Sequence, residues 1–106
     1  MASFDDRKTI ENIARNFTEL LRSEMNIKEV YLYGSAARGG ANADSDIDIA
    51  VVGDDFIGDP VEDRFKLMKL RRKVDTRIEP HHFQSSEFDK SNPFVKEIIS
   101  TGIKIF

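Results

Sequence analysis

The sequence from Gly34 to Asp48 reads GSAARGGANADSDID. Directly before it, VYLY (residues 30–33) is a short β-rich run that stops at Gly34, and residues 35–39 can open a short helix. Unpaired N–H groups at such a turn, together with the Ser35 hydroxyl, suit a phosphate group, and Gly34 lets the backbone approach it without a Cβ. The pattern therefore predicts a phosphate-binding turn. The alternative is a strand-to-helix turn that binds nothing.

The end of this stretch begins a second strand, DIDIAVV (residues 46–52). Because side chains alternate along a strand, Asp46 and Asp48 lie on one face, and Ile47 and Ile49 lie on the other. Two adjacent buried carboxylates repel each other without a cation, and Mg²⁺ commonly joins such carboxylates to substrate phosphates. We therefore expect a metal-binding Asp-x-Asp pair. The alternative is an edge strand whose acidic face lies in water.

Together, the two features resemble the signature of the polymerase-β-like nucleotidyltransferase superfamily. In this sequence, GSAARG (residues 34–39) is followed, six residues later, by DID (residues 46–48). The small size of the chain resembles the minimal nucleotidyltransferases, many of which are antitoxins partnered with HEPN-domain toxins. The inferred order of helices and strands matches that family along nearly the whole chain.

The resemblance implies a role for five residues of this motif. It implies nucleotide binding by Gly34, Ser35 and Arg38. It implies metal binding and catalysis by Asp46 and Asp48. For Arg38, the residues alone leave an alternative, which is a surface arginine paired with a nearby acid.

The family uses a third carboxylate on a later strand beside the Asp-x-Asp strand, and two residues qualify. We expect a strand over residues 74–79, ended by Pro80, on which Asp75 and Glu79 share a face. Asp75 has the residue type that is usual in the family, whereas Glu79 has the better spacing from Asp48 and from the last strand. We favour Glu79 as the third metal ligand and keep Asp75 as the alternative.

The rest of the chain alternates helices and strands. We expect helices over residues 4–24, from Asp59-Pro60 to about residue 72 and from Asn92-Pro93 to Gly102, with a short final strand over residues 103–106. In the second of these helices, Phe65, Met68 and Leu67 are the residues expected to face inward. The order predicts an α/β (α+β) fold, a small mixed sheet with helices packed mainly on one face, as in polymerase-β-like nucleotidyltransferases. We treat residues 1–106 as a single nucleotidyltransferase domain.

Composition limits the partners that the chain can have. Its 106 residues carry a net charge of −3 with a pI of about 5.4, which does not favour a polynucleotide ligand, because that needs a cationic surface. There is no cysteine, and His81 and His82 match no zinc-binding pattern. No signal peptide is visible, and no apolar run approaches the roughly 18 residues of a membrane span. We therefore expect a cytoplasmic protein with no membrane partner.

These expectations combine into one function and one alternative. By resemblance, we expect a Mg²⁺-dependent nucleotidyltransferase with two metal ions. It would transfer a nucleoside monophosphate, AMP from ATP, to an acceptor hydroxyl that a partner protein can supply. The alternative is an antitoxin that neutralises a HEPN toxin by direct contact, with catalysis secondary or lost.

Overall fold

The strands of the described residues form one mixed sheet in the order β3-β2-β1-β4. The structure is a computed structural model that describes residues 7–38, 46–56 and 59–106. Strand β1 is antiparallel to β2 and β4, whereas β2 is parallel to β3. The strands are β1 Ile27–Tyr33, β2 Ile47–Gly53, β3 Ile78–Gln84 and β4 Ile103–Lys104. The helices are α1 Arg7–Glu24, α2 Ser35–Arg38, α3 Pro60–Arg71 and α4 Pro93–Thr101, with a 3-10 turn at Ser85–Glu87. The expected alternation of helices and strands and the mixed sheet are confirmed.

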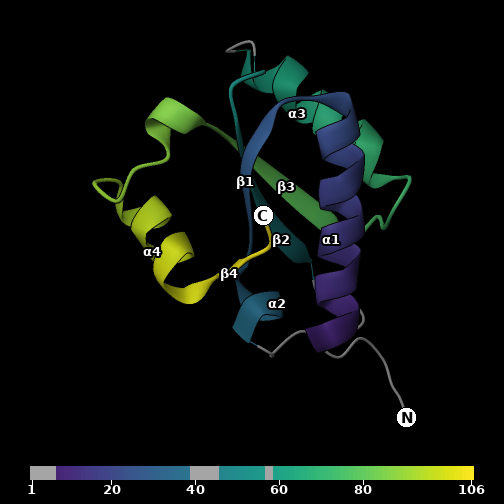
Figure 1. Cartoon of the computed structure of the whole chain (residues 1–106), viewed down its shortest axis with the longest axis horizontal. Coiled ribbons are helices and arrows are strands. Elements are labelled where there is room, and N and C mark those ends of the chain that lie inside the picture. The colour runs from purple at the N-terminus through teal and green to yellow at the C-terminus, as the bar shows by residue number, and fades with distance from the viewer. Residues whose placement is uncertain (1–6, 39–45, 57–58) are drawn as a thin grey trace.

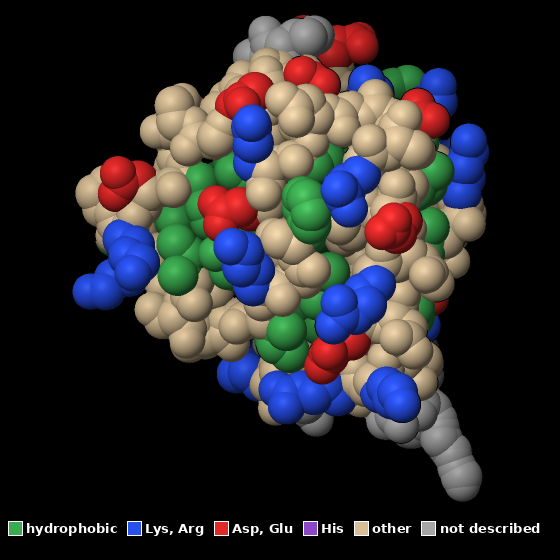
Figure 2. Space-filling model, viewed as in Figure 1, with side chains coloured by type: hydrophobic (Ala, Val, Ile, Leu, Met, Phe, Trp, Pro, Cys, Tyr) green, Lys and Arg blue, Asp and Glu red, His purple; other side chains and the backbone are tan. Residues whose placement is uncertain are grey.

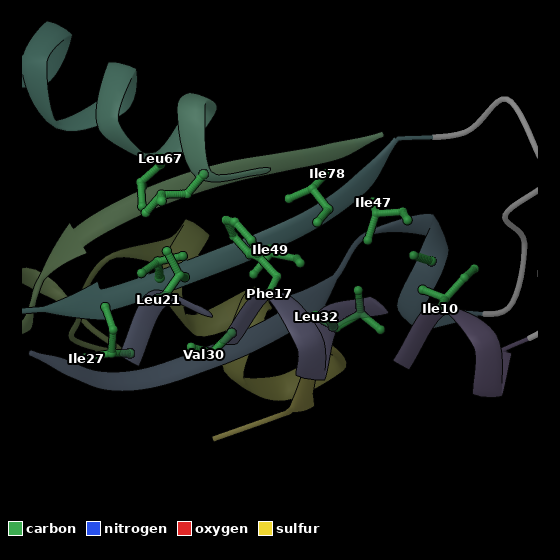
Figure 3. Packing of buried hydrophobic residues seen from close by; sticks show 14 of the residues in the cluster. Ile10, Phe17, Leu21, Ile27, Val30, Leu32, Ile47, Ile49, Leu67 and Ile78 are labelled. Atoms are coloured by element: carbon green, nitrogen blue, oxygen red, sulfur yellow. The ribbon is translucent and has the colours of Figure 1, made fainter. Parts of the chain in front are cut away.

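Helices cover the two faces of the sheet unequally. Helices α1 and α3 pack on one face, and α4 packs on the other, so that α1 and α4 lie on opposite sides of the strands (Figure 1). The larger cluster lies between α1, α3 and the sheet (Figure 3), and its fully buried members include Phe17, Leu21, Leu32, Ile47, Ile49, Leu67 and Ile78. This main core determines which residues of each strand are left for the opposite face.

Helix α1 matches the apolar periodicity of its sequence. Its buried residues include Ile10, Ala14, Phe17 and Leu21, which recur at the spacing of one helix face. The predicted start near residue 4 lies outside the described residues.

Helix α3 begins as predicted, and its inward face differs from the prediction at Phe65. The Asp59 side chain accepts hydrogen bonds from the backbone N–H groups of Val61 and Glu62, so Asp59 is the N-cap. Leu67 and Leu70 are buried, whereas the Phe65 side chain is 60% exposed. The prediction that Phe65 faces inward was therefore wrong. The buried residues of α3 include Asp63, Leu67 and Leu70, which follow one another at the spacing of a single helix face, and Phe65 does not lie on that face.

The third strand begins later than the sequence predicted. Residues 72–77 form turns, and β3 runs from Ile78 through Pro80 to Gln84, so the predicted strand over residues 74–79 was wrong. Pro80 does not end the strand because β3 is an edge strand, where a residue without an N–H group leaves no ladder hydrogen bond broken. Asp75 consequently lies outside the sheet, and Glu79 lies within it.

The C-terminal elements match their predicted positions. Helix α4 starts at the Asn92 cap, whose side chain accepts from the Phe94 N–H, and it buries Val95 and Ile98 against β1. The chain then pairs with β1 through β4.

The surface shows charges of both signs. On the face drawn in Figure 2, described Lys and Arg side chains are interspersed with Asp and Glu, and no continuous basic band crosses that face. Within the described parts of the chain, no helix combines the length and the apolar character that a membrane crossing requires.

Candidate active site

Three polar side chains lie in a row across the sheet, one on each of three neighbouring strands. The strand register pairs Tyr33 of β1 with Asp48 of β2, and it pairs Asp48 with Glu79 of β3. Because alternate residues share a face, all three lie on the face opposite the main core, to which Ile47, Ile49 and Ile78 contribute. This site row brings together Asp48 and the favoured third carboxylate, which are 31 residues apart in sequence.

Gly34 follows β1 directly and lies against the Asp48 carboxylate. Its φ of +74° is in the left-handed region that favours glycine. A Cβ at this position would lie 2.5 Å from Asp48 Oδ2. The Gly34 carbonyl accepts hydrogen bonds from the N–H groups of Ala37 and Arg38, which closes the turn into α2. The glycine thus leaves the Asp48 carboxylate room to lie over the turn.

The remaining motif residues surround this turn. Asp46 immediately precedes β2, and its side chain is exposed. Ser35 is half-buried as the first residue of α2, and Arg38 is exposed as the last. A cavity of about 140 Å³ adjoins the turn, and its lining includes Tyr33, Gly34, Arg38, Phe94 and Glu97. Residues 39–45, which include the Gly39 and Ser45 of the motif, lie outside the described residues.

Glu79 has a partner that the sequence did not reveal. Nη2 of Arg64, on α3, donates to Glu79 Oε1 at 2.5 Å, and Arg64 Nη1 donates to the Pro80 carbonyl at 3.3 Å. The side chains are 43% and 27% exposed for Arg64 and Glu79, respectively. The chain order β2-α3-β3 is visible in the sequence, but the parallel pairing of β2 and β3 that goes with α3 lying beside Glu79 is not.

The alternative acid, Asp75, is engaged elsewhere. Its carboxylate accepts from the backbone N–H, Nε and Nη2 of Arg77. These hydrogen bonds hold the pKa of Asp75 below its ordinary value, although partial burial opposes the shift. Asp75 is not part of the site row, because it lies in the turn before β3.

Aromatic rings flank the site row. The Tyr33 ring centroid lies 5.8 Å from that of His81 and 5.9 Å from that of Phe94. Burial, followed by the negative charges of Asp48 and Glu79, raises the pKa of Tyr33 above its ordinary value. Tyr33 therefore keeps its proton at neutral pH, and its phenol adds no negative charge to the site.

The two histidines lie on opposite faces of β3. His81 Nε2 is 3.8 Å from Asp48 Oδ1, so His81 borders the site row. His82 packs on Phe56, with Nε2 3.9 Å from Oδ2 of the buried Asp63. Both histidines are half-buried.

The donor set suits a hard divalent cation. Asp46, Asp48 and Glu79 offer only carboxylate oxygens, the ligands that Mg²⁺ prefers. The Asp48 carboxylate occupies the space that a side chain at residue 34 would fill, beside the turn that would hold phosphate. Within the described residues, no three acids or histidines form a group that could hold a metal ion. The residue types therefore fit a divalent cation. In this arrangement, however, the Glu79 carboxylate contacts Arg64.

Comparisons with known proteins identify the family to which the sequence is similar. A family model described as "Polymerase beta, Nucleotidyltransferase" matches residues 15–106. No curated protein matches the chain by sequence.

Three solved structures are similar in fold. A nucleotidyltransferase candidate from Sulfolobus solfataricus has a TM-score of 0.66 at 24% identity, over 92% of this chain and 80% of its own. A toxin–antitoxin structure with AMP-PNP has a TM-score of 0.65 at 24% identity, over 91% and 72% of the two chains. A complex of a tri-AMPylated Shewanella oneidensis HEPN toxin with an MNT antitoxin has a TM-score of 0.61 at 22% identity, over 94% and 71%.

Proposed function

Because the chain belongs to the polymerase beta nucleotidyltransferase family, we propose that it transfers a nucleoside monophosphate from an NTP to an acceptor hydroxyl. ATP is the proposed donor, so the transferred group is AMP. The acceptor oxygen forms a bond to the α-phosphorus, the bond to pyrophosphate breaks, and the hydroxyl proton passes to solvent. The observation that carries the proposal is the site row, in which Asp48 lies between Glu79 and the Gly34 turn.

The proposed residue roles follow from their positions. Gly34 and Ser35 hold the β- and γ-phosphates through backbone N–H groups and the hydroxyl. Arg38 is exposed at the end of α2 and lines the cavity that adjoins the Gly34 turn, where it offers positive charge to the phosphate chain. In-line attack depends mainly on positioning and charge neutralisation, so these contacts orient the triphosphate before reaction.

The acidic residues would hold two Mg²⁺ ions. Asp46 and Asp48 are the proposed ligands of both ions, and Glu79 adds a ligand to the second. Bound Mg²⁺ would neutralise phosphate charge and lower the pKa of the acceptor hydroxyl. Asp75 is left out of the proposed ligand set because its carboxylate binds Arg77.

A titration with and without metal tests this proposal. The chain, labelled with ¹⁵N, is titrated with ATP in the presence and absence of Mg²⁺. We expect Mg²⁺-dependent shifts at Gly34, Ser35 and β2, and their loss in the double variant Asp46→Asn/Asp48→Asn. Binding that needs no Mg²⁺ and survives the double substitution would contradict the proposed site.

A partner protein is the proposed source of the acceptor. Two of the similar structures are toxin–antitoxin assemblies, and one of these contains a HEPN toxin that carries AMP. We therefore propose a helical HEPN-type partner. Incubation of the chain with labelled ATP, Mg²⁺ and a HEPN protein encoded beside it should label the partner, and the Asp48→Asn variant should not label it.

The second candidate function is neutralisation of such a partner by binding alone. It is favoured by apolar side chains that α3 leaves exposed, with Val61 at 76% and Phe65 at 60%. Under this alternative, Asp48→Asn still neutralises the partner, whereas Val61→Ser/Phe65→Ser does not. Under the transfer proposal, Asp48→Asn no longer neutralises the partner.

A further inference from the structure

Arg64 contacts the site row from outside the sheet. It belongs to α3, on the main-core face, and its guanidinium reaches the outer edge strand β3. There it donates to Glu79 Oε1 at 2.5 Å and to the Pro80 carbonyl at 3.3 Å. One guanidinium nitrogen thus contacts the backbone, and the other contacts Glu79, which the strand register pairs with Asp48.

A guanidinium and a divalent cation compete for the same carboxylate. An oxygen that accepts a short charge-assisted hydrogen bond has fewer lone pairs for a metal, and the positive charge of Arg64 repels a cation nearby. Within the described residues, the acids do not form a three-member metal cluster. In the described part of the chain, the Glu79 carboxylate is held by its contact with Arg64.

We propose that Arg64 is a positioning residue that holds Glu79 in the cation-free protein and releases it when a divalent cation binds beside Asp48. This inference rests on the proposed function, because it takes Glu79 to be the third metal ligand. The contact with the Pro80 carbonyl keeps the guanidinium at the edge of the site after release. Arg64 thereby delays completion of the metal site until the cation is present.

The exposure of the pair sets the size of the effect. An ion pair whose side chains are 43% and 27% exposed is weak, because water screens it. A cation can therefore displace the arginine without a large loss of affinity. We expect removal of Arg64 to tighten cation binding by about twofold to fivefold, within the range that a weak ion pair permits.

Mn²⁺ binding to the full chain, measured by electron paramagnetic resonance without nucleotide, tests the proposal. Arg64→Met should bind Mn²⁺ about twofold to fivefold more tightly than wild type. Arg64→Lys should show a smaller gain, because it keeps the charge and loses the two-point contact. In a Glu79→Gln background, Arg64→Met should bring no gain.

Two controls separate the contact from general charge effects. Arg15→Met removes an exposed arginine of α1 that pairs with Glu11, and it should leave Mn²⁺ binding unchanged. If the Arg64→Met gain persists in the Glu79→Gln background, the effect is long-range charge and the proposal fails. If Arg64→Met binds Mn²⁺ more weakly than wild type, Arg64 presents Glu79 to the cation and the proposal is overturned.

A spectroscopic readout follows the arginine itself. In wild type, the Arg64 Nε–Hε resonance should shift as Mg²⁺ is added, and it should not shift in Asp48→Asn. If Arg64→Met does not fold, as judged by far-ultraviolet circular dichroism, Arg64→Lys and this resonance decide the question. Wild type that shows no Asp48-dependent cation binding would contradict the proposed function, whereas cation binding with a static Arg64 resonance would contradict this inference alone.

Discussion

Along β2, Ile47 and Ile49 point into the aliphatic core beneath α1, whereas Asp48 between them points to the opposite face beside Tyr33. The same alternation continues on β3, where Ile78 joins the core and Glu79 joins the site row. One face of these strands contributes to the larger buried cluster, and the other carries the residues of the proposed chemistry. The comparison predicts that stability and the proposed metal binding can be altered separately by substitutions only one residue apart.

Substitution on the core face should have the largest effect on stability. Ile49 is fully buried, and Ile49→Ala should lower the free energy of unfolding by about 3 kcal/mol, because it removes buried methyl groups and leaves a cavity. Urea denaturation followed by circular dichroism measures the change. The control is Val61→Ala at an exposed position, with an expected change within about 0.5 kcal/mol. An equal loss for both would mean that the main core does not dominate stability.

The adjacent residue on the other face should behave in the opposite way. Asp48→Asn should weaken Mn²⁺ binding by at least the roughly tenfold to hundredfold that loss of an outer-shell partner costs. Its free energy of unfolding should stay within about 0.5 kcal/mol of wild type, because the side chain is not part of the core. Calorimetric titration with Mn²⁺ and urea denaturation give the two values. A large stability loss would show that the two faces are not separable.

Gly34→Ala should affect both faces moderately. A Cβ at φ +74° costs about 1–2 kcal/mol, and it would also displace the Asp48 carboxylate, whose Oδ2 lies 2.5 Å away. We expect weaker Mn²⁺ binding together with this loss of stability. In the double variant Gly34→Ala/Asp48→Ala, only the backbone cost should remain. Additive effects of the two substitutions on stability would argue against the contact.

The smallest effect is expected at Asp75. Asp75→Asn should cost less than about 1 kcal/mol and should leave Mn²⁺ binding unchanged, because Asp75 pairs with Arg77 outside the site row. The lowered pKa of Asp75 means that its stabilising contribution is complete above the unfolded-state pKa and is lost as the pH falls through the folded-state pKa. The stability difference between wild type and Asp75→Asn should therefore vanish in acid, which urea denaturation at several pH values can measure. A weaker Mn²⁺ affinity in this variant would return Asp75 to the ligand candidates.

The sequence predicted the elements whose signals are local. The Asp-x-Asp alternation on β2, the Asp59 and Asn92 caps and the order of helices and strands all depend on residues close together in the chain. The start of β3 was predicted wrongly, because Asp75 and Arg77 form a local turn that strand propensity does not reveal. The inward face of α3 was predicted only in part, because Leu67 is buried as expected and Phe65 is exposed.

The candidate site was predictable only in part. The motif located Gly34 and Asp48, and spacing favoured Glu79 over Asp75. Arg64 could not be found, because its contact with Glu79 depends on α3 lying beside an edge strand, which is a long-range consequence of strand order. The choice between the two acids likewise required the parallel register of β2 and β3.

The proline inside β3 has a consequence for how the molecule can associate. Edge strands expose N–H and C=O groups to which another strand can add. On the outer edge of β3, the Ile78 N–H donates to the Asp75 carbonyl, and the Ile78 carbonyl accepts from Arg71. Pro80 has no N–H, and its carbonyl accepts from Arg64. The edge beside the site is thus already capped, so another chain must approach it through side chains and not by extending the sheet.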